Sequence, residues 1–183
     1  MLSDKSILER MSGGGLTISP FNPEFLQPAS YDIHLGSTFR VFVNSHRAQI
    51  IDPEQDQSHL WEVIEIPEGE AFILHPGDFA LGASAEWFAF PDDMLGDLDG
   101  KSSLGRLGLL VHATAGYFDP GFQGTATLEL SSVIPMPIRL RPGIKIGQMR
   151  FATTSTPVMR AYGSDGLGSH YHRQRNPEPS RPL

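Results

Sequence analysis

Four basic or hydroxyl side chains stand close together in a glycine-rich stretch near the middle of the chain. They are Lys101, Ser102, Ser103 and Arg106. Glycines in such a stretch free backbone N–H groups, which can hold an anion together with ammonium and guanidinium groups. The pattern indicates either an anion-binding turn or a glycine-rich connector whose basic side chains are solvated.

A nucleotide-binding phosphate loop is excluded by spacing. Residues 100–102 read Gly-Lys-Ser, like the end of that motif, but only three residues separate this run from Gly96 where the motif needs four. Two of those three residues are Asp97 and Asp99, whose carboxylates would repel phosphate.

Two carboxylates follow the basic segment. Asp119 lies in an Asp-Pro-Gly turn, and Glu129 lies in a run of alternating polar and apolar residues. The alternation places Glu129 on one face of a predicted strand with Thr125 and Thr127. It also fits a half-exposed strand whose carboxylate faces water. Because cations, hydroxyls and carboxylates gather within residues 100–130, we interpret this segment as a candidate active site.

Several kinds of catalytic site are excluded by the residues present. The chain has no cysteine, which excludes disulfides, thiolate zinc sites and cysteine nucleophiles. A zinc-dependent nucleoside deaminase requires His-x-Glu and Pro-Cys-x-x-Cys, and neither occurs. The sequence around Ser102 lacks the last glycine of the hydrolase motif Gly-x-Ser-x-Gly. His170 and His172 have metal-ligand spacing but lie in a glycine-rich tail, so we predict no metal site built from protein ligands.

Length and charge limit the possible partners. With 183 residues the chain is long enough for one domain with a substantial core. The net charge of −7 argues against a nucleic-acid partner, whereas a small anionic ligand fits where cations are local or a divalent metal accompanies it. No segment approaches a membrane span and the first residues lack an apolar signal region, so we expect a cytoplasmic protein with no membrane partner.

The order of apolar residues and turns predicts a mainly β chain. A short helix is expected over residues 3–11, with Ser3 as its cap and glycines 13–15 at its end. A second short helical piece is expected over 91–99. Pro-Gly turns recur between strand candidates, which is typical of an antiparallel β-barrel or jelly roll. The strand candidates are residues 31–36, 39–43, 61–66, 71–74, 79–90, 107–114, 125–130, 137–140 and 144–151.

Two features of the last forty residues suggest ligand contacts. In the strand candidate at 144–151 the even positions should face the core, yet Gln148 occupies one; either a bulge at Gly147 turns it outward or it points inward and needs partners. From Tyr162 the chain is polar and glycine-rich. We expect residues 1–161 to form a β-barrel domain and residues 162–183 to form a flexible tail, either frayed or closing over a ligand as a lid.

Several separated motifs, in order along nearly the whole chain, resemble the deoxycytidine triphosphate (dCTP) deaminase family of the trimeric dUTPase superfamily. The central motifs are residues 99–109, 112–124 and 127–129, and the flanking ones are residues 29–36, 141–149 and 162–174. The resemblance implies a distorted antiparallel β-barrel of the trimeric dUTPase type with a short N-terminal helix. It also implies a homotrimer with active sites at subunit interfaces, Mg²⁺ bound mainly through the substrate triphosphate, no zinc, and dTTP as a feedback inhibitor.

The same resemblance implies roles for individual residues. Glu129 would be the general base for water that attacks C4 of cytosine, Ser102 and the carbonyl of Ala115 would hold that water, and Arg106 would contact phosphate and orient Glu129. His170 departs from the family, whose members usually carry lysine there. The residues implied to bind substrate are Lys101, Ser102, Ser103, Leu104, Gly105, Arg106, Asp119, Thr127, Leu128, Glu129, Gln148, Tyr162, His170 and Gln174.

Two residues bear on which reaction is expected. Gly116 and Tyr117 resemble the branch of the family that converts dCTP to dUMP, ammonia and pyrophosphate, supplying dUMP for thymidylate synthesis. In that branch Asp119 would orient the water that attacks the α-phosphorus. The alternative is a monofunctional deaminase that releases dUTP. A third interpretation, a nucleotide-binding or regulatory member without catalysis, would predict loss of Glu129, Ser102 or Arg106, and none is lost.

Overall fold

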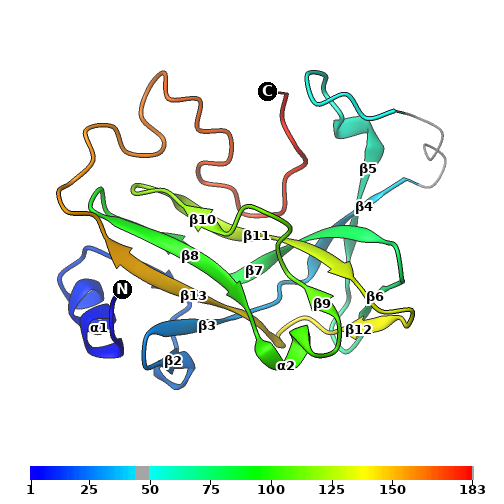
Figure 1. Ribbon diagram of the computed structural model, residues 1–183, viewed down its shortest axis with the longest axis horizontal. Coiled ribbons are helices and arrows are strands. Elements are labelled where there is room, and N and C mark those ends of the chain that lie inside the picture. The colour runs from blue at the N-terminus through cyan, green and yellow to red at the C-terminus, as the bar shows by residue number, and fades with distance from the viewer. Residues whose placement is uncertain (44–49, 183) are drawn as a thin grey trace.

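A computed structural model describes residues 1–43 and 50–182 of the chain; residues 44–49, within the predicted barrel domain, and Leu183, the last residue of the predicted tail, lie outside the described residues. Two antiparallel sheets dominate it, and a small two-stranded sheet lies beside them (Figure 1). One sheet has the order β5-β4-β7-β11-β9, with β1 also paired to β7, and the other has the order β10-β8-β13-β3-β2. Strands β12 and β6 pair separately. The mainly β, antiparallel fold with a short N-terminal helix is as predicted.

The elements follow one another in this order. They are α1 (Asp4–Ser12), β1 (Thr17–Ser19), β2 (Leu26–Gln27), β3 (Ser30–His34), β4 (Thr38–Phe42), β5 (Trp61–Glu65), β6 (Phe72–Leu74), β7 (Phe79–Ala89), β8 (Met94–Gly100), α2 (Ser102–Gly105), β9 (Leu109–Leu110), β10 (Tyr117–Phe118), β11 (Gln123–Ser132), β12 (Ile138–Leu140) and β13 (Lys145–Thr153). Two single 3₁₀ turns, Pro23–Phe25 and Ser58–Leu60, precede β2 and β5.

The core lies between the two large sheets. Tyr31, Phe88, Leu128 and Phe151, from strands of both sheets, are fully buried there. A buried polar pair also joins the sheets: the backbone N–H of His34 donates to Glu86 at 2.9 Å, and the His34 Nδ1 atom lies 2.7 Å from the second oxygen of that carboxylate. Because buried polar groups need partners, this pair fixes how β3 sits on β7.

Helix α1 covers one end of the core. Its first turn is capped by Ser3, whose hydroxyl accepts a hydrogen bond from the N–H of Ser6 at 3.3 Å. Ile7 is fully buried, and Arg10 forms an ion pair with Asp93. Within the described ranges, neither helix is long and apolar enough to pass through a bilayer.

Two predicted elements were wrong. Residues 91–99 do not form a helix, since Met94–Gly100 is β8 and pairs with β13 along its whole length. The apolar residues of this segment alternate and fill the core from one face, so tertiary pairing overrides the local helical pattern. The strand expected over 107–114 is reduced to the two residues of β9, and the preceding glycine-rich stretch contains the short helix α2.

Ile7 tests how much α1 contributes to stability. We expect Ile7→Ala to lower the free energy of unfolding by about 2–4 kcal/mol, because it leaves a cavity at a fully buried position. Urea denaturation measures the loss. Leu8→Ala on the exposed side of the same helix is the matched control, and an equal loss in both variants would contradict the assigned packing.

Candidate active site

Glu129 is held by the backbone of a neighbouring loop. Leu128 and Leu130 on either side are fully buried in the core, so Glu129 lies on the opposite face of β11 as the alternation predicts. Its backbone N–H donates to the carbonyl of Val111 at 2.9 Å, and one carboxylate oxygen accepts a hydrogen bond from the N–H of Ala113 at 2.6 Å. The carboxylate is therefore partly buried and oriented, and its second oxygen has no hydrogen bond from the described residues.

The Glu129 side chain borders a cavity of about 390 Å³, a size typical of small-molecule sites. Aromatic and aliphatic groups form much of its wall, and polar groups come from β11, from the loop of residues 112–122 before it and from the tail. The lining residues are Trp61, Phe79, Leu81, Ala115, Tyr117, Phe118, Asp119, Phe122, Thr127, Glu129, Tyr162, Tyr171, Gln174, Glu178 and Ser180. The cavity thus brings together seven predicted site residues, namely Ala115, Tyr117, Asp119, Thr127, Glu129, Tyr162 and Gln174.

The tail lies along β11 and closes this cavity (Figure 1, orange to red). Gln174 is 5% exposed; its side-chain amide donates to the carbonyl of Thr125 at 3.0 Å and to the hydroxyl of Thr127 at 2.9 Å. Its backbone carbonyl accepts from the N–H of Thr125 at 3.0 Å. The side-chain oxygen of Gln174 has no partner in the described residues. This oxygen is fully buried, a position in which an acceptor normally has a partner. The flexibility of the tail stays a prediction.

Burial within the folded tail changes two side-chain pKa values. The pKa of the Tyr162 hydroxyl is raised, chiefly by burial, and this hydroxyl accepts a hydrogen bond from the N–H of Tyr171 at 3.0 Å. The pKa of His172 is lowered, first by burial and then by the nearby positive charge of Arg173. A lowered pKa keeps His172 neutral near pH 7, so the folded tail does not hold a partly buried imidazolium.

Gly116 lies where the loop of residues 112–122 packs against β8. Its carbonyl accepts a hydrogen bond from the N–H of Leu98 at 2.7 Å. A Cβ atom at Gly116 would lie 2.7 Å from the carbonyl oxygen of Leu98 and 3.5 Å from the ring of His112. No larger residue fits this backbone path, which presents Ala115 and Tyr117 to the cavity.

The remaining predicted site residues do not reach this cavity within one chain. Ser102, Ser103, Gly105 and Arg106 are exposed on and beside α2, with Leu104 partly buried, and none lines the cavity. His170 in the tail is exposed and does not line it either. Leu128 faces the core, so its contribution to a site is limited to its backbone.

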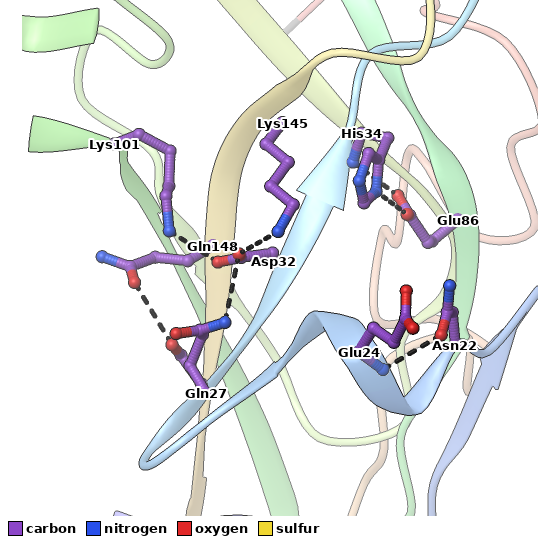
Figure 2. Close-up of polar contacts among 10 residues, drawn as sticks. Asn22, Glu24, Gln27, Asp32, His34, Glu86, Lys101, Lys145 and Gln148 are labelled. Carbon is purple, nitrogen blue, oxygen red and sulfur yellow. Dashed lines mark hydrogen bonds and ion pairs between the residues drawn. The ribbon is translucent and has the colours of Figure 1, made fainter. Parts of the chain in front are cut away.

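Lys101 and Gln148 belong to a second polar cluster, centred on Asp32 (Figure 2). The Lys101 ammonium lies 2.6 Å from one Asp32 oxygen and the Lys145 ammonium 3.3 Å from the other. Gln148 accepts from the hydroxyl of Ser30 at 3.2 Å. The bulge predicted at this part of β13 is confirmed by a register shift between Lys145 and Gly147, which leaves Gln148 outside the core.

Sequence reasoning missed several of these residues. Alternation alone could have placed Asp32 on the polar face of its strand, because Tyr31 and Ile33 beside it are fully buried. No local sequence pattern marks Trp61 or Glu178 as a site residue, because they line the same cavity as Glu129 only once distant segments have folded together. The described residues contain no group of three or more His, Cys, Asp or Glu side chains placed to hold a metal ion.

Comparison with known proteins identifies the class to which this fold and site belong. A family model described as dCTP deaminase-like matches residues 1–154. The chain is 52% identical to "dCTP deaminase, dUMP-forming" of Acidothermus cellulolyticus, over 99% of this chain and 94% of that protein. It is 50% identical to the protein of the same description from Bifidobacterium longum, over 99% of this chain and 93% of that protein. The chain therefore belongs to the dCTP deaminase-like family.

A solved structure agrees with this assignment. It is the 2'-deoxycytidine 5'-triphosphate deaminase from Agrobacterium tumefaciens, which matches with a TM-score of 0.64 and 25% identity. The match covers 84% of the present chain and 48% of that one, so this chain spans about half the length of the solved protein.

Gly116 provides a test of how closely the loop of residues 112–122 packs against β8. We expect Gly116→Ala to lower the free energy of unfolding by about 1–3 kcal/mol, because its methyl group would overlap the carbonyl oxygen of Leu98. Urea denaturation measures the change. Gly105→Ala is the control, since nothing lies within 4 Å of the methyl group added there. A Gly116→Ala variant as stable as the control would contradict the close approach.

Proposed function

We propose that this chain is a bifunctional, zinc-independent hydrolase that converts dCTP to dUMP, ammonia and pyrophosphate. The observation that carries the proposal is the Glu129 carboxylate, held by the Ala113 N–H at 2.6 Å on the wall of the cavity. The descriptions of the relatives at 50–52% identity support it and favour dUMP formation over the alternative in which dUTP is released.

In the first reaction, Glu129 removes a proton from a water molecule whose oxygen attacks C4 of the cytosine. The Ala113 hydrogen bond occupies one carboxylate oxygen and leaves the other for this water. The carbonyl of Ala115 and the hydroxyl of Ser102 orient the water. Glu129 then delivers the proton to the departing amino group, the C4–N bond breaks, and ammonia leaves. A positioned carboxylate can carry a proton in both directions in this way.

In the second reaction, water attacks the α-phosphorus while the bond to the bridging oxygen breaks and pyrophosphate leaves. Asp119, at the cavity wall, orients this water. Gly116 and Tyr117 shape the loop that presents Asp119, and Tyr162 and Gln174 close the cavity from the tail. Lys101, Ser103, Arg106, Gln148 and His170 bind the phosphates, with the backbone of Leu104 and Gly105. The backbone of Thr127 and Leu128 contacts the base.

Mg²⁺ would be held mainly by the phosphates, and when bound it would supply positive charge against the leaving pyrophosphate. The chemistry of the available donors fits this arrangement. Asp32, the carboxylate closest to the basic residues, already receives two ammonium groups, so phosphate oxygens are the main ligands left for the ion.

The distribution of site residues supports a homotrimer with shared sites. Glu129 and Asp119 lie at the cavity, whereas Ser102 and Arg106 are exposed elsewhere on the same chain. In a cyclic trimer α2 of one subunit reaches the cavity of the next, which completes each site.

We further propose that dTTP binds the same pocket as a feedback inhibitor. Residues 162–183 form a flexible lid on a domain of residues 1–161, and the enzyme acts in the cytoplasm.

Glu129→Gln tests the assigned base. We expect the rate of ammonia release from dCTP to fall by about 10²-fold or more, because the amide cannot accept the proton, while dCTP binding persists. Ammonia release and equilibrium binding are the measurements. Glu62→Gln, an exposed site outside the cavity, is the control for charge.

The products formed by the wild-type protein test the bifunctional reaction. From dCTP we expect dUMP without free dUTP, whereas accumulated dUTP would contradict the bifunctional reaction.

Mixed trimers test the sharing of sites. Glu129→Gln and Arg106→Ala should each be inactive alone. When the two variants are unfolded together and refolded as a one-to-one mixture, about a quarter of the sites should pair an intact Glu129 with an intact Arg106 from the neighbouring subunit. Deamination should return to about that fraction of the wild-type rate. A mixture as inactive as its parts would show that both residues act within one chain.

A further inference from the structure

The Asp32 carboxylate, with one negative charge, forms ion pairs with two ammonium groups, those of Lys101 and Lys145. Its side chain is only 3% exposed, and an isolated carboxylate in such a position would be costly. Lys101 at 2.6 Å already compensates it, and Gln27 adds a hydrogen bond at 3.3 Å. The second ammonium group, that of Lys145 at 3.3 Å, therefore leaves the cluster with a net charge of about +1.

A β-bulge is what brings Lys145 to this cluster. Residues three apart on a regular strand point to opposite faces, so Lys145 and Gln148 should not meet. The register of β13 on β3 shifts between Lys145, opposite His34, and Gly147, opposite Ile33. The extra residue places Lys145 and Gln148 on one side, where Figure 2 shows both near Asp32.

Most of the hydrogen-bonding capacity of Lys145 remains available. Its side chain is 46% exposed, against 25% for Lys101. Its ammonium group, with three N–H bonds, forms an ion pair with Asp32 at 3.3 Å; the ring of Phe25, 5.3 Å away, supports the cation from another side. The next carboxylates along this face, those of Asp97 and Asp99, are already paired with Arg150.

We propose that Lys145 binds the β- or γ-phosphate of the nucleotide, as a further substrate-contacting residue beside Lys101 and Gln148, and that Asp32 is the positioning residue for both lysines. This inference rests on the proposed function. A fixed ammonium with free donors binds phosphate oxygens as a point charge. At this position it contacts the part of the substrate that leaves as pyrophosphate, and it does not contact the base.

The test compares two ligands that differ in the pyrophosphate group. Titrations with α,β-imido-dUTP and with dUMP, both with Mg²⁺, give a dissociation constant for each. For Lys145→Met, which keeps the stem on Phe25 but removes the charge, binding of α,β-imido-dUTP should weaken about tenfold, the size of one charge-assisted hydrogen bond. Binding of dUMP should stay unchanged, and Lys145→Arg should restore most of the loss.

Lys5→Met on helix α1 is the matched control, since it makes the same change in net charge far from the cluster and should bind both ligands like the wild type. The ratio of the two dissociation constants is insensitive to the fraction of folded protein. An unchanged ratio in Lys145→Met would overturn the inference. If the wild-type protein released no ammonia from dCTP, the proposed function itself would fail; ammonia release with an unchanged ratio would refute only the role of Lys145.

Discussion

The hydrogen bond from the Ala113 N–H to Glu129 is the interaction on which the candidate site depends. It links β11, whose opposite face is buried in the core, to the loop of residues 112–122, which carries Ala115 and Asp119. This loop is in turn fixed by the close approach of Gly116 to Leu98. A carboxylate placed on a core strand and oriented by a backbone donor is pre-organised, so little reorganisation is needed when a ligand arrives.

Much of the fold follows from local patterns. Alternation in β3, β11 and β13 decides which side chains face the core, and it correctly placed Glu129 and exposed the anomaly at Gln148. The patterns failed where partners decide the structure: Met94–Gly100 is a strand because β13 lies beside it. They also failed to predict that α2 forms in the glycine-rich stretch.

The site was less accessible to sequence reasoning than the fold. Motifs close in sequence, such as residues 101–106 and Glu129, lie apart in one chain, while Tyr171 and Glu178 join the cavity from the far end of the chain. Alternation cannot reveal which distant residues lie together, because this depends on how the segments pack in space. The family resemblance gave a set of expected site residues, and only part of that set lines the cavity of a single chain.

The contact between the tail and β11 has a second consequence. Gln174 pairs in parallel with Gly124, and the N–H of Arg173 donates to Gln123 at 2.6 Å, so the tail covers main-chain groups at the start of a strand. Uncovered strand edges are templates for association with other molecules. The tail thereby shields this strand edge, and loss of the contact would leave the edge open to association with other molecules.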